Sequence, residues 1–182
     1  MRNIKNNHGI IIVIIRPNDY IRSYNKIIYQ MKESAGITTE NFKQLRRILG
    51  KKYLKTNVES SYDFINIANK GVNANIIKNF RKYFNLSLGD TAHMLNISEP
   101  TVYRWTRSNK NLERNYSVKL FEITKLFLYG SDVFGGKENF FKWLNLPNTA
   151  LGGMEPQELI EIPEGISKVS DIIGRIEHGV YS

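Results

Sequence analysis

One stretch constrains the fold of this chain more than any other, residues 87–108, SLGDTAHMLNISEPTVYRWTRS. Ala92 is small, and four positions later Asn96 is a residue type that tolerates the left-handed backbone of a tight turn. Apolar side chains then follow five, ten and thirteen positions after Ala92, at Ile97, Val102 and Trp105. This spacing predicts a helix-turn-helix with helices at 88–95 and 99–107, capped by Ser87 and Ser98.

The second helix of this hairpin carries a polar and cationic face of the kind that reads DNA from the major groove. The side chains expected to contact DNA are Ser98, Glu99, Thr101, Tyr103, Arg104, Arg107 and Lys110. Glu99 is the exception on this face, since it repels phosphate; the alternative role for its carboxylate is to accept a hydrogen bond from a cytosine amino group. A plain αα-hairpin with a solvated face has the same outline. Basic residues around the hairpin favour DNA as the partner, namely Lys78, Arg81, Lys82, Lys110 and Arg114.

The charge of the chain is unevenly distributed. The net charge of the 182 residues is +9. Residues 1–129 hold 22 Lys and Arg against 9 Asp and Glu, a net charge of +13, whereas residues 130–182 hold 4 against 8, a net charge of −4. This asymmetry predicts that the basic part meets a polyanion and the acidic part a different partner, the alternative being a solvated surface without a specific use.

Most of the remaining sequence has helical periodicity, so the predicted fold class is mainly α. A short strand is expected in GIIIVII, before Pro17. Helices are expected at residues 40–49, 61–69, 74–84, 116–134 and 137–144, in a short turn opened by Pro156, and from Gly165 to Gly179. We expect an N-terminal extension (1–60), a helix-turn-helix domain for DNA binding and dimerisation (61–129), and a small helical C-terminal domain (130–182).

The composition excludes several function classes. The chain has no cysteine, and its longest apolar run, Ile10–Ile15, is too short to span a bilayer. The three histidines have no metal-ligand spacing, and the carboxylates of EPQELIEIPEG suggest no acid–base pair. GSDVFGGKE follows a predicted helix, whereas a phosphate-binding loop follows a strand. We therefore expect a cytoplasmic protein that is not an enzyme, with no cofactor, no metal and no membrane contact.

The last fifty residues resemble the C-terminal domain of the Xre/MbcA/ParS antitoxin family. The resemblance is carried by Phe134-Gly135, Trp143-Leu144, Pro147-Asn148, Leu151-Gly152-Gly153, Pro156, Gly165 and the end from Ile176 to Gly179. Upstream, Lys70-Gly71 and the hairpin also look like the family, so that the resemblance covers residues 62–182. Tyr103-Arg104-Trp105 stand where relatives often show an Arg-rich run, which puts the base preference in doubt.

The resemblance implies an antitoxin that neutralises a RES-type, NAD-depleting toxin with its C-terminal domain. It also implies that the antitoxin binds its own operator DNA as a homodimer and assembles with the toxin into a larger complex. The residues it assigns to toxin binding are Trp143, Asn148, Leu151, Gly152, Gly153, Pro156, Arg175, His178, Gly179, Val180, Tyr181 and Ser182.

Several alternatives remain open at this stage. The chain could instead be a stand-alone helix-turn-helix transcriptional regulator without a toxin partner. LGGM is either a plain turn or a backbone surface that a partner approaches closely. The last three residues are either a frayed end or an aromatic anchor for a partner. The N-terminal extension either adds a dimer contact or adds nothing.

Overall fold

The computed structural model describes residues 2–5, 11–14, 39–54 and 61–180 of the chain. It divides into two units, Met1–Gly36 and Ile37–Ser182. In the first unit, β1 (Arg2–Lys5) pairs with β2 (Ile11–Ile14) in an antiparallel register that places Arg2 opposite Ile14. The strand predicted in GIIIVII is thereby confirmed.

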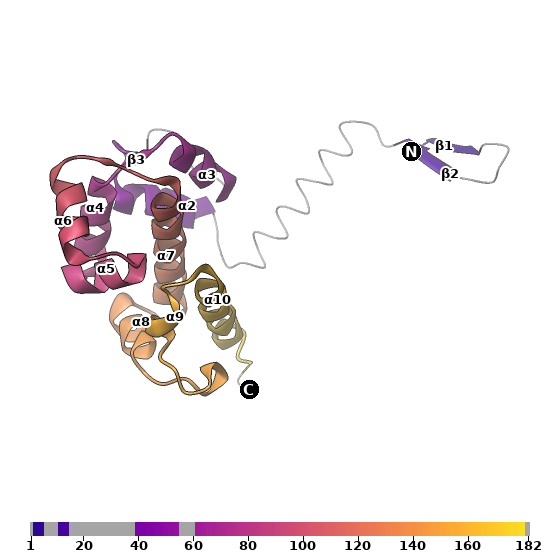
Figure 1. The fold of residues 1–182 in the computed structure, drawn as a ribbon. Coiled ribbons are helices and arrows are strands. Elements are labelled where there is room, and N and C mark those ends of the chain that lie inside the picture. The colour runs from indigo at the N-terminus through magenta and orange to yellow at the C-terminus, as the bar shows by residue number, and fades with distance from the viewer. Residues whose placement is uncertain (1, 6–10, 15–38, 55–60, 181–182) are drawn as a thin grey trace. The chain divides into compact units, whose positions relative to one another are not determined.

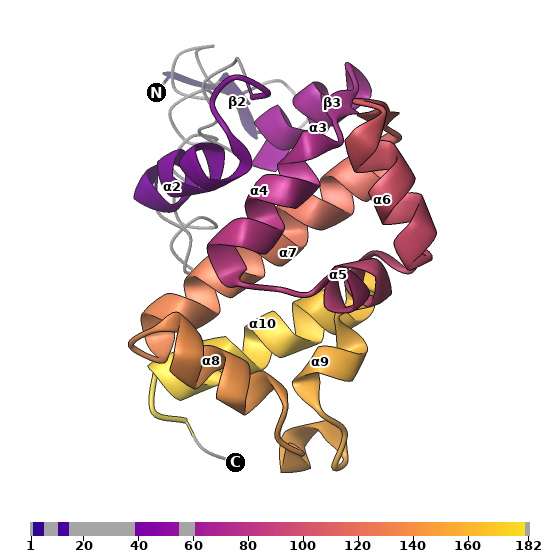
Figure 2. The same cartoon turned by 90° about the vertical axis from the view of Figure 1, so that its left-hand side faces the viewer.

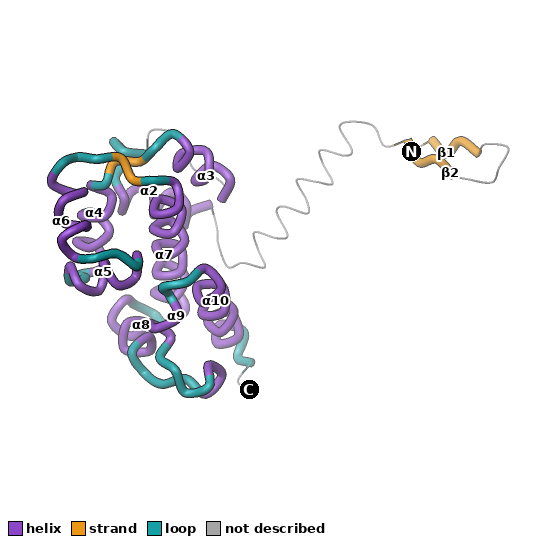
Figure 3. The backbone as a smooth tube through the Cα atoms, in the orientation of Figure 1, coloured by secondary structure: helices purple, strands orange, loops and turns teal. Residues whose placement is uncertain are grey.

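The second unit is built almost entirely of helices (Figure 3). In chain order they are α2 (Thr39–Leu49), α3 (Ser61–Asn69), α4 (Asn75–Phe84), α5 (Leu88–Leu95), α6 (Glu99–Arg107), α7 (Arg114–Val133), α8 (Lys137–Leu144), the 3-10 turn η1 (Thr149–Leu151), α9 (Pro156–Leu159) and α10 (Pro163–Glu177). Two-residue strands β3 (Val72–Asn73) and β4 (Asn111–Leu112) pair antiparallel. The mainly α fold predicted from periodicity is confirmed.

Two details of these helices differ from the sequence-based expectation. The helix expected at residues 74–84 begins one residue later, at Asn75, so that Ala74 and not Asn73 occupies its N-cap position. The side-chain oxygen of Asn73 still accepts a hydrogen bond from the backbone N–H of Asn75, at 2.9 Å. The last helix was expected to begin after Gly165, yet α10 begins at Pro163. The fixed φ of proline suits the first helical position, so Pro163 starts the helix and Gly165 lies inside it.

The long helix α7 lies at the centre of this unit (Figures 1 and 2). It packs against α2, α3, α8 and α10. Phe127 lies in the middle of an aromatic group, with its ring centroid 5.7 Å from Phe80, 5.2 Å from Phe84 and 5.6 Å from Phe140. Phe80 and Phe84 come from α4 and Phe140 from α8, so α7 joins the two helices in one core. The boundary expected between residues 129 and 130 therefore falls inside α7, whose buried side chains belong to one continuous core.

Candidate functional sites

The two helices and the turn predicted for residues 88–107 are formed. Ser87 and Asp90 make a capping box at the start of α5: the Asp90 N–H donates to the Ser87 hydroxyl at 2.9 Å, and the Ser87 N–H donates to the Asp90 carboxylate at 3.0 Å. Asn96 takes the left-handed conformation, with φ of +54°. Ala92 and Val102 are buried where α5 and α6 cross.

The outward face of α6 is open to solvent. Ser98, Glu99, Tyr103, Arg104, Arg107 and the following Lys110 are exposed, and Thr101 is half-buried. Ser98 occupies the N-cap position of α6 as expected, but its side chain does not cap the helix. The Ser98 hydroxyl instead forms a hydrogen bond with the Thr101 hydroxyl at 2.9 Å, because Thr101 lies three residues later, on the same face of α6.

Tyr103 and Arg107 form a pair on this face. The Arg107 guanidinium donates to the Tyr103 hydroxyl at 2.5 Å and lies 5.8 Å from the centre of its ring. Tyr103 remains 54% exposed, so the pair projects from the helix. Trp105, by contrast, is buried against Tyr116 with the ring centroids 4.9 Å apart. The side chains expected to read DNA and those expected to build the core are thus separated on opposite faces of α6.

Glu99 has a local environment that the sequence did not indicate. A Cβ atom built on Gly89, in the first turn of α5, would lie 3.1 Å from the Glu99 Oε1 and 3.6 Å from the Ser87 hydroxyl. The carboxylate of Glu99 therefore lies beside the N-terminal turn of α5, where the helix dipole is positive. This position explains how an acidic residue is accommodated on a face that is otherwise cationic.

Cationic side chains surround the hairpin on neighbouring elements. Lys78 and Lys82 on α4 are exposed, as are Lys110 and Arg114. Arg81 is half-buried, and its Nε donates to the Ser87 carbonyl at 3.3 Å, which ties α4 to the start of α5. These residues add positive charge on α4, which packs against α6, and on the segment that follows α6, where phosphate contacts would be available.

A tight loop between α8 and α9 contains four of the twelve residues that the family resemblance assigns to toxin binding, namely Asn148, Leu151, Gly152 and Gly153. Asn148 organises it: its N–H donates to the Met154 carbonyl at 3.0 Å, and its carbonyl accepts from the Gly153 N–H at 2.9 Å. Its side-chain oxygen accepts from the Ala150 N–H at 2.9 Å. Gly152 and Gly153 have φ values of +67° and +87° and face open space.

The exposed apolar side chains of this loop are not the ones expected from the sequence. Leu151 and Pro156 are buried and support the loop from within. Trp143 is half-buried, with its ring centroid 5.0 Å from that of Phe134. Leu146 and Met154 are 57% and 44% exposed, at the two ends of the loop. The sequence did contain a signal for the exposure of Leu146 and Met154, because both flank the turn-forming segment that ends in Leu151-Gly152-Gly153.

The end of α10 provides the other group of expected toxin-binding residues. Arg175, His178, Gly179 and Val180 are exposed, while Tyr181 and Ser182 lie outside the described residues. In Figures 1 and 2 the last turn of α10 and the loop between α8 and α9 both lie in the lower part of the second unit.

A polar contact joins the helix-turn-helix to the C-terminal segment. Nε2 of His93 on α5 lies 2.8 Å from a carboxylate oxygen of Glu161, in the turn between α9 and α10. Lys119 on α7 donates to the Glu161 carbonyl at 2.5 Å, and burial lowers the pKa of Lys119. Glu161 therefore binds both α5 and α7.

Across residues 2–5, 11–14, 39–54 and 61–180, no three His, Asp or Glu side chains gather as a metal ion would need. Among the helices described, none is long and apolar enough to cross a bilayer.

Comparison with known proteins identifies the C-terminal part. Residues 130–179 match the model of the antitoxin Xre/MbcA/ParS C-terminal toxin-binding domain. Antitoxin Xre of Photorhabdus laumondii is 24% identical over 117 residues, covering 64% of this chain and 79% of the relative. A protein named Prs ADP-ribosylating antitoxin, from Sphingobium sp., is 27% identical over 132 residues, covering 68% and 83%.

Two further similarities are shorter or weaker. Antitoxin Xre of Yersinia enterocolitica is 44% identical over 52 residues, which are 28% of this chain and 35% of that protein. The crystal structure of the MbcT-MbcA toxin–antitoxin complex of M. tuberculosis is matched with a TM-score of 0.45 at 20% identity, over 60% of this chain and 96% of that chain.

The family resemblance noted in the sequence is thus confirmed, and it leaves no reason to treat the chain as a regulator without a partner. Residues 130–179 form the C-terminal toxin-binding domain of the Xre/MbcA/ParS antitoxin family, and the chain is an antitoxin of a toxin–antitoxin system.

Proposed function

We propose that this antitoxin neutralises a RES-type toxin that consumes NAD, and that it binds its own operator through α6 as a homodimer, with toxin and antitoxin assembling into a larger complex. In this proposal the protein acts by binding alone, without catalysis or a cofactor. It works in the cytoplasm, where its operator lies.

The region around the η1 loop and the end of α10 supports the toxin-binding part of the proposal. Leu146, Met154 and Val180 account for three of the five large apolar side chains that are strongly exposed among the described residues. All three belong to the segment from α8 onward. Large apolar side chains left exposed in one segment of the chain support a protein–protein contact, in which a few anchors supply most of the binding energy.

The nature of the toxin is supported by the name of one relative and by charge. The Sphingobium relative is called a Prs ADP-ribosylating antitoxin, and ADP-ribosylation draws its ADP-ribose from NAD. A site that holds anionic NAD needs cationic groups, and residues 130–182 have a net charge of −4. Two toxin activities fit this chemistry: breakdown of NAD itself, or transfer of ADP-ribose to a protein.

The operator-binding part of the proposal is supported by the face of α6. Arg104 and Arg107 are exposed on the second helix of a formed helix-turn-helix, with Lys78, Lys82 and Lys110 on its flanks. Helices of this kind read base edges in the major groove, and flanking cations contact phosphates. Operators of such hairpins consist of two half-sites about one helical turn apart, which requires a dimer.

Co-expression with the product of the adjacent open reading frame tests the toxin-binding part. The full-length antitoxin should restore growth and the NAD level of cells that express this toxin. Removal of residues 178–182 should abolish the rescue, and so should the double variant Leu146→Ser and Met154→Ser if the loop is part of the contact. Arg104→Ala serves as the matched control, because it lies on α6 and should leave rescue intact. Rescue by all three variants would refute the proposed toxin-binding surface.

A further inference from the structure

The chain beyond α10 leaves the helix in a defined direction. Gly179 has φ of +68°, and its N–H donates to the Ile176 carbonyl at 3.0 Å. The Val180 N–H donates to the Arg175 carbonyl at 2.8 Å. This pair of bonds is the Schellman motif, which closes a helix and fixes the path of the next residues. The path of residues 178–180, here called the tail, therefore depends on how the last turn of α10 is held.

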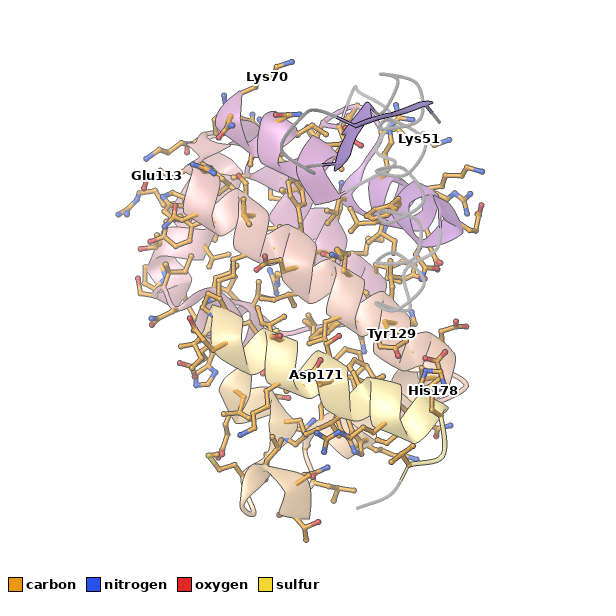
Figure 4. All side chains as sticks on the ribbon, turned by 90° about the vertical axis from the view of Figure 1, so that its right-hand side faces the viewer. Lys51, Lys70, Glu113, Tyr129, Asp171 and His178 are labelled. Atoms are coloured by element: carbon orange, nitrogen blue, oxygen red, sulfur yellow. The ribbon has the colours of Figure 1, made fainter. Side chains whose placement is uncertain are left out.

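A side-chain hydrogen bond joins that last turn to α7. The hydroxyl of Tyr129, on α7, donates to a carboxylate oxygen of Glu177 at 2.6 Å. Figure 4 shows Tyr129 beside the end of α10, close to His178. The ring of Tyr129 is buried, with 6% of its surface exposed, whereas Glu177 is exposed. The bond thus joins a fixed residue of the core to the turn from which the tail departs.

The environment of Tyr129 keeps its hydroxyl protonated, so that it can always donate the hydrogen bond to Glu177. Burial, followed by the hydrogen bond to Glu177 and the charge of that carboxylate, raises the pKa of Tyr129 far above its ordinary value. The phenol consequently keeps its proton at every physiological pH. A hydrogen bond between a neutral donor and a charged carboxylate is stronger than one between two neutral groups. The hydroxyl is also close to α10 itself, because a Cβ atom on Gly174 would lie 3.4 Å from it.

We propose that Tyr129 is a positioning residue for toxin binding: its hydroxyl holds the last turn of α10 against α7 and so sets the direction in which the tail meets the toxin. The inference rests on the proposed function, in which the tail contacts the toxin. Tyr129 itself is buried and makes no contact with the partner. Its effect is to reduce the number of directions that the tail samples before binding, which lowers the entropic cost of the complex.

Tyr129→Phe tests the inference because it keeps the buried ring and removes only the hydroxyl. In the free full-length protein, hydrogen exchange at the amides of residues 178–180 should become roughly five- to tenfold faster, as expected for the loss of one hydrogen bond. Exchange in α6 should not change. Affinity for the purified product of the adjacent open reading frame should fall by a similar factor, and the melting temperature should change little. Unchanged exchange at residues 178–180 would overturn the proposal.

Variants of the acceptor separate this role from a direct contact of Glu177 with the toxin. Glu177→Gln keeps an oxygen that accepts from Tyr129 but removes the charge, so its loss of affinity should be smaller than that of Glu177→Ala. Glu177→Ala should weaken binding as Tyr129→Phe does, and the double variant should be no weaker than either single variant. Additive losses would show that Glu177 acts apart from Tyr129, against the proposal.

Two experimental outcomes distinguish the toxin contact of the tail from the positioning role of Tyr129. If removal of residues 178–182 leaves toxin affinity unchanged, the proposed function of the tail is wrong, whatever the exchange rates show. If that removal weakens binding while Tyr129→Phe accelerates exchange without loss of affinity, the tail binds the toxin but does not need the direction that Tyr129 gives it. That second outcome would overturn the positioning role alone.

Discussion

In the toxin-binding domain, the structure predicts that Gly165→Ala, which adds one methyl group, causes a large loss of stability. A Cβ atom at Gly165 would lie 1.9 Å from the backbone oxygen of Leu159 and 2.7 Å from its carbonyl carbon. Real Cβ contacts are essentially never shorter than 3.0 Å, so α9 and α10 would have to separate by about 1.1 Å, the difference between 3.0 Å and 1.9 Å. The obstructing atoms are backbone, which cannot rotate away.

The cost of Gly165→Ala follows from this geometry. Overpacking of a well-packed core costs about 1–3 kcal/mol, and we expect the upper part of that range here, about 2–3 kcal/mol, because a backbone must move. For a chain of this size each kcal/mol lowers the melting temperature by roughly 2–4 °C, so the expected decrease is roughly 4–12 °C.

Gly174→Ala is the matched control, because Gly174 lies in the same helix and the nearest atom to its added Cβ is the Tyr129 hydroxyl oxygen, at 3.4 Å. An alanine there should stabilise α10 by about 0.5–1 kcal/mol through its better helix propensity. Thermal unfolding followed by circular dichroism compares both variants with the natural protein. Equal melting temperatures for Gly165→Ala and Gly174→Ala would refute the close approach of α9 and α10.

Further predictions concern the DNA-binding face and the assembly. If Arg104 contacts a base, Arg104→Ala should weaken operator binding by about 1–3 kcal/mol, and if Arg107 contacts phosphate, Arg107→Ala should mainly reduce the salt dependence of binding. Mobility shifts with the antitoxin's own promoter at two salt concentrations measure both effects. Unchanged binding of both variants would show that α6 is not part of the interface. Glu99→Gln should tighten binding, since it removes a negative charge near phosphates, and weaker binding would instead support a contact from Glu99 to a cytosine amino group. Light scattering should show at least a dimer with its contact within residues 1–130, and a monomer at micromolar concentration, with and without DNA, would contradict this expectation.

The sequence was sufficient where local signals determine the structure. The capping pair around Ser87, the turn at Asn96 and the glycines after α8 act through nearby backbone, so their effect can be read from neighbouring residues. The helical stripes were equally clear, because burial of one face repeats every three to four residues. Helix boundaries and the family resemblance therefore agreed with the structure over most of residues 61–180.

Contacts between distant segments could not be predicted in this way. Nothing near Gly165 in the sequence indicates that Leu159 folds back over it, and the approach of Glu99 to Gly89 depends on the crossing of two helices. The bond from Tyr129 to Glu177 joins residues 48 positions apart. The exposure of Leu146 and Met154 was missed for a related reason, since apolar residues are expected in the core unless the packing around them is known.

The continuity of α7 has a consequence for how toxin and DNA are presented to each other. Modules joined by a flexible linker sample many separations, and their joint binding depends on linker length. Here 20 residues of helix, about 30 Å long at 1.5 Å per residue, run without a break from the hairpin into the toxin-binding domain. The contacts of Glu161 with α5 and α7 also attach the turn between α9 and α10 to the hairpin and to the long helix. Under the proposed function, a toxin bound to one antitoxin therefore has a fixed orientation relative to the DNA half-site of that antitoxin. The width of the toxin then decides whether the antitoxin on the neighbouring half-site can bind a second toxin.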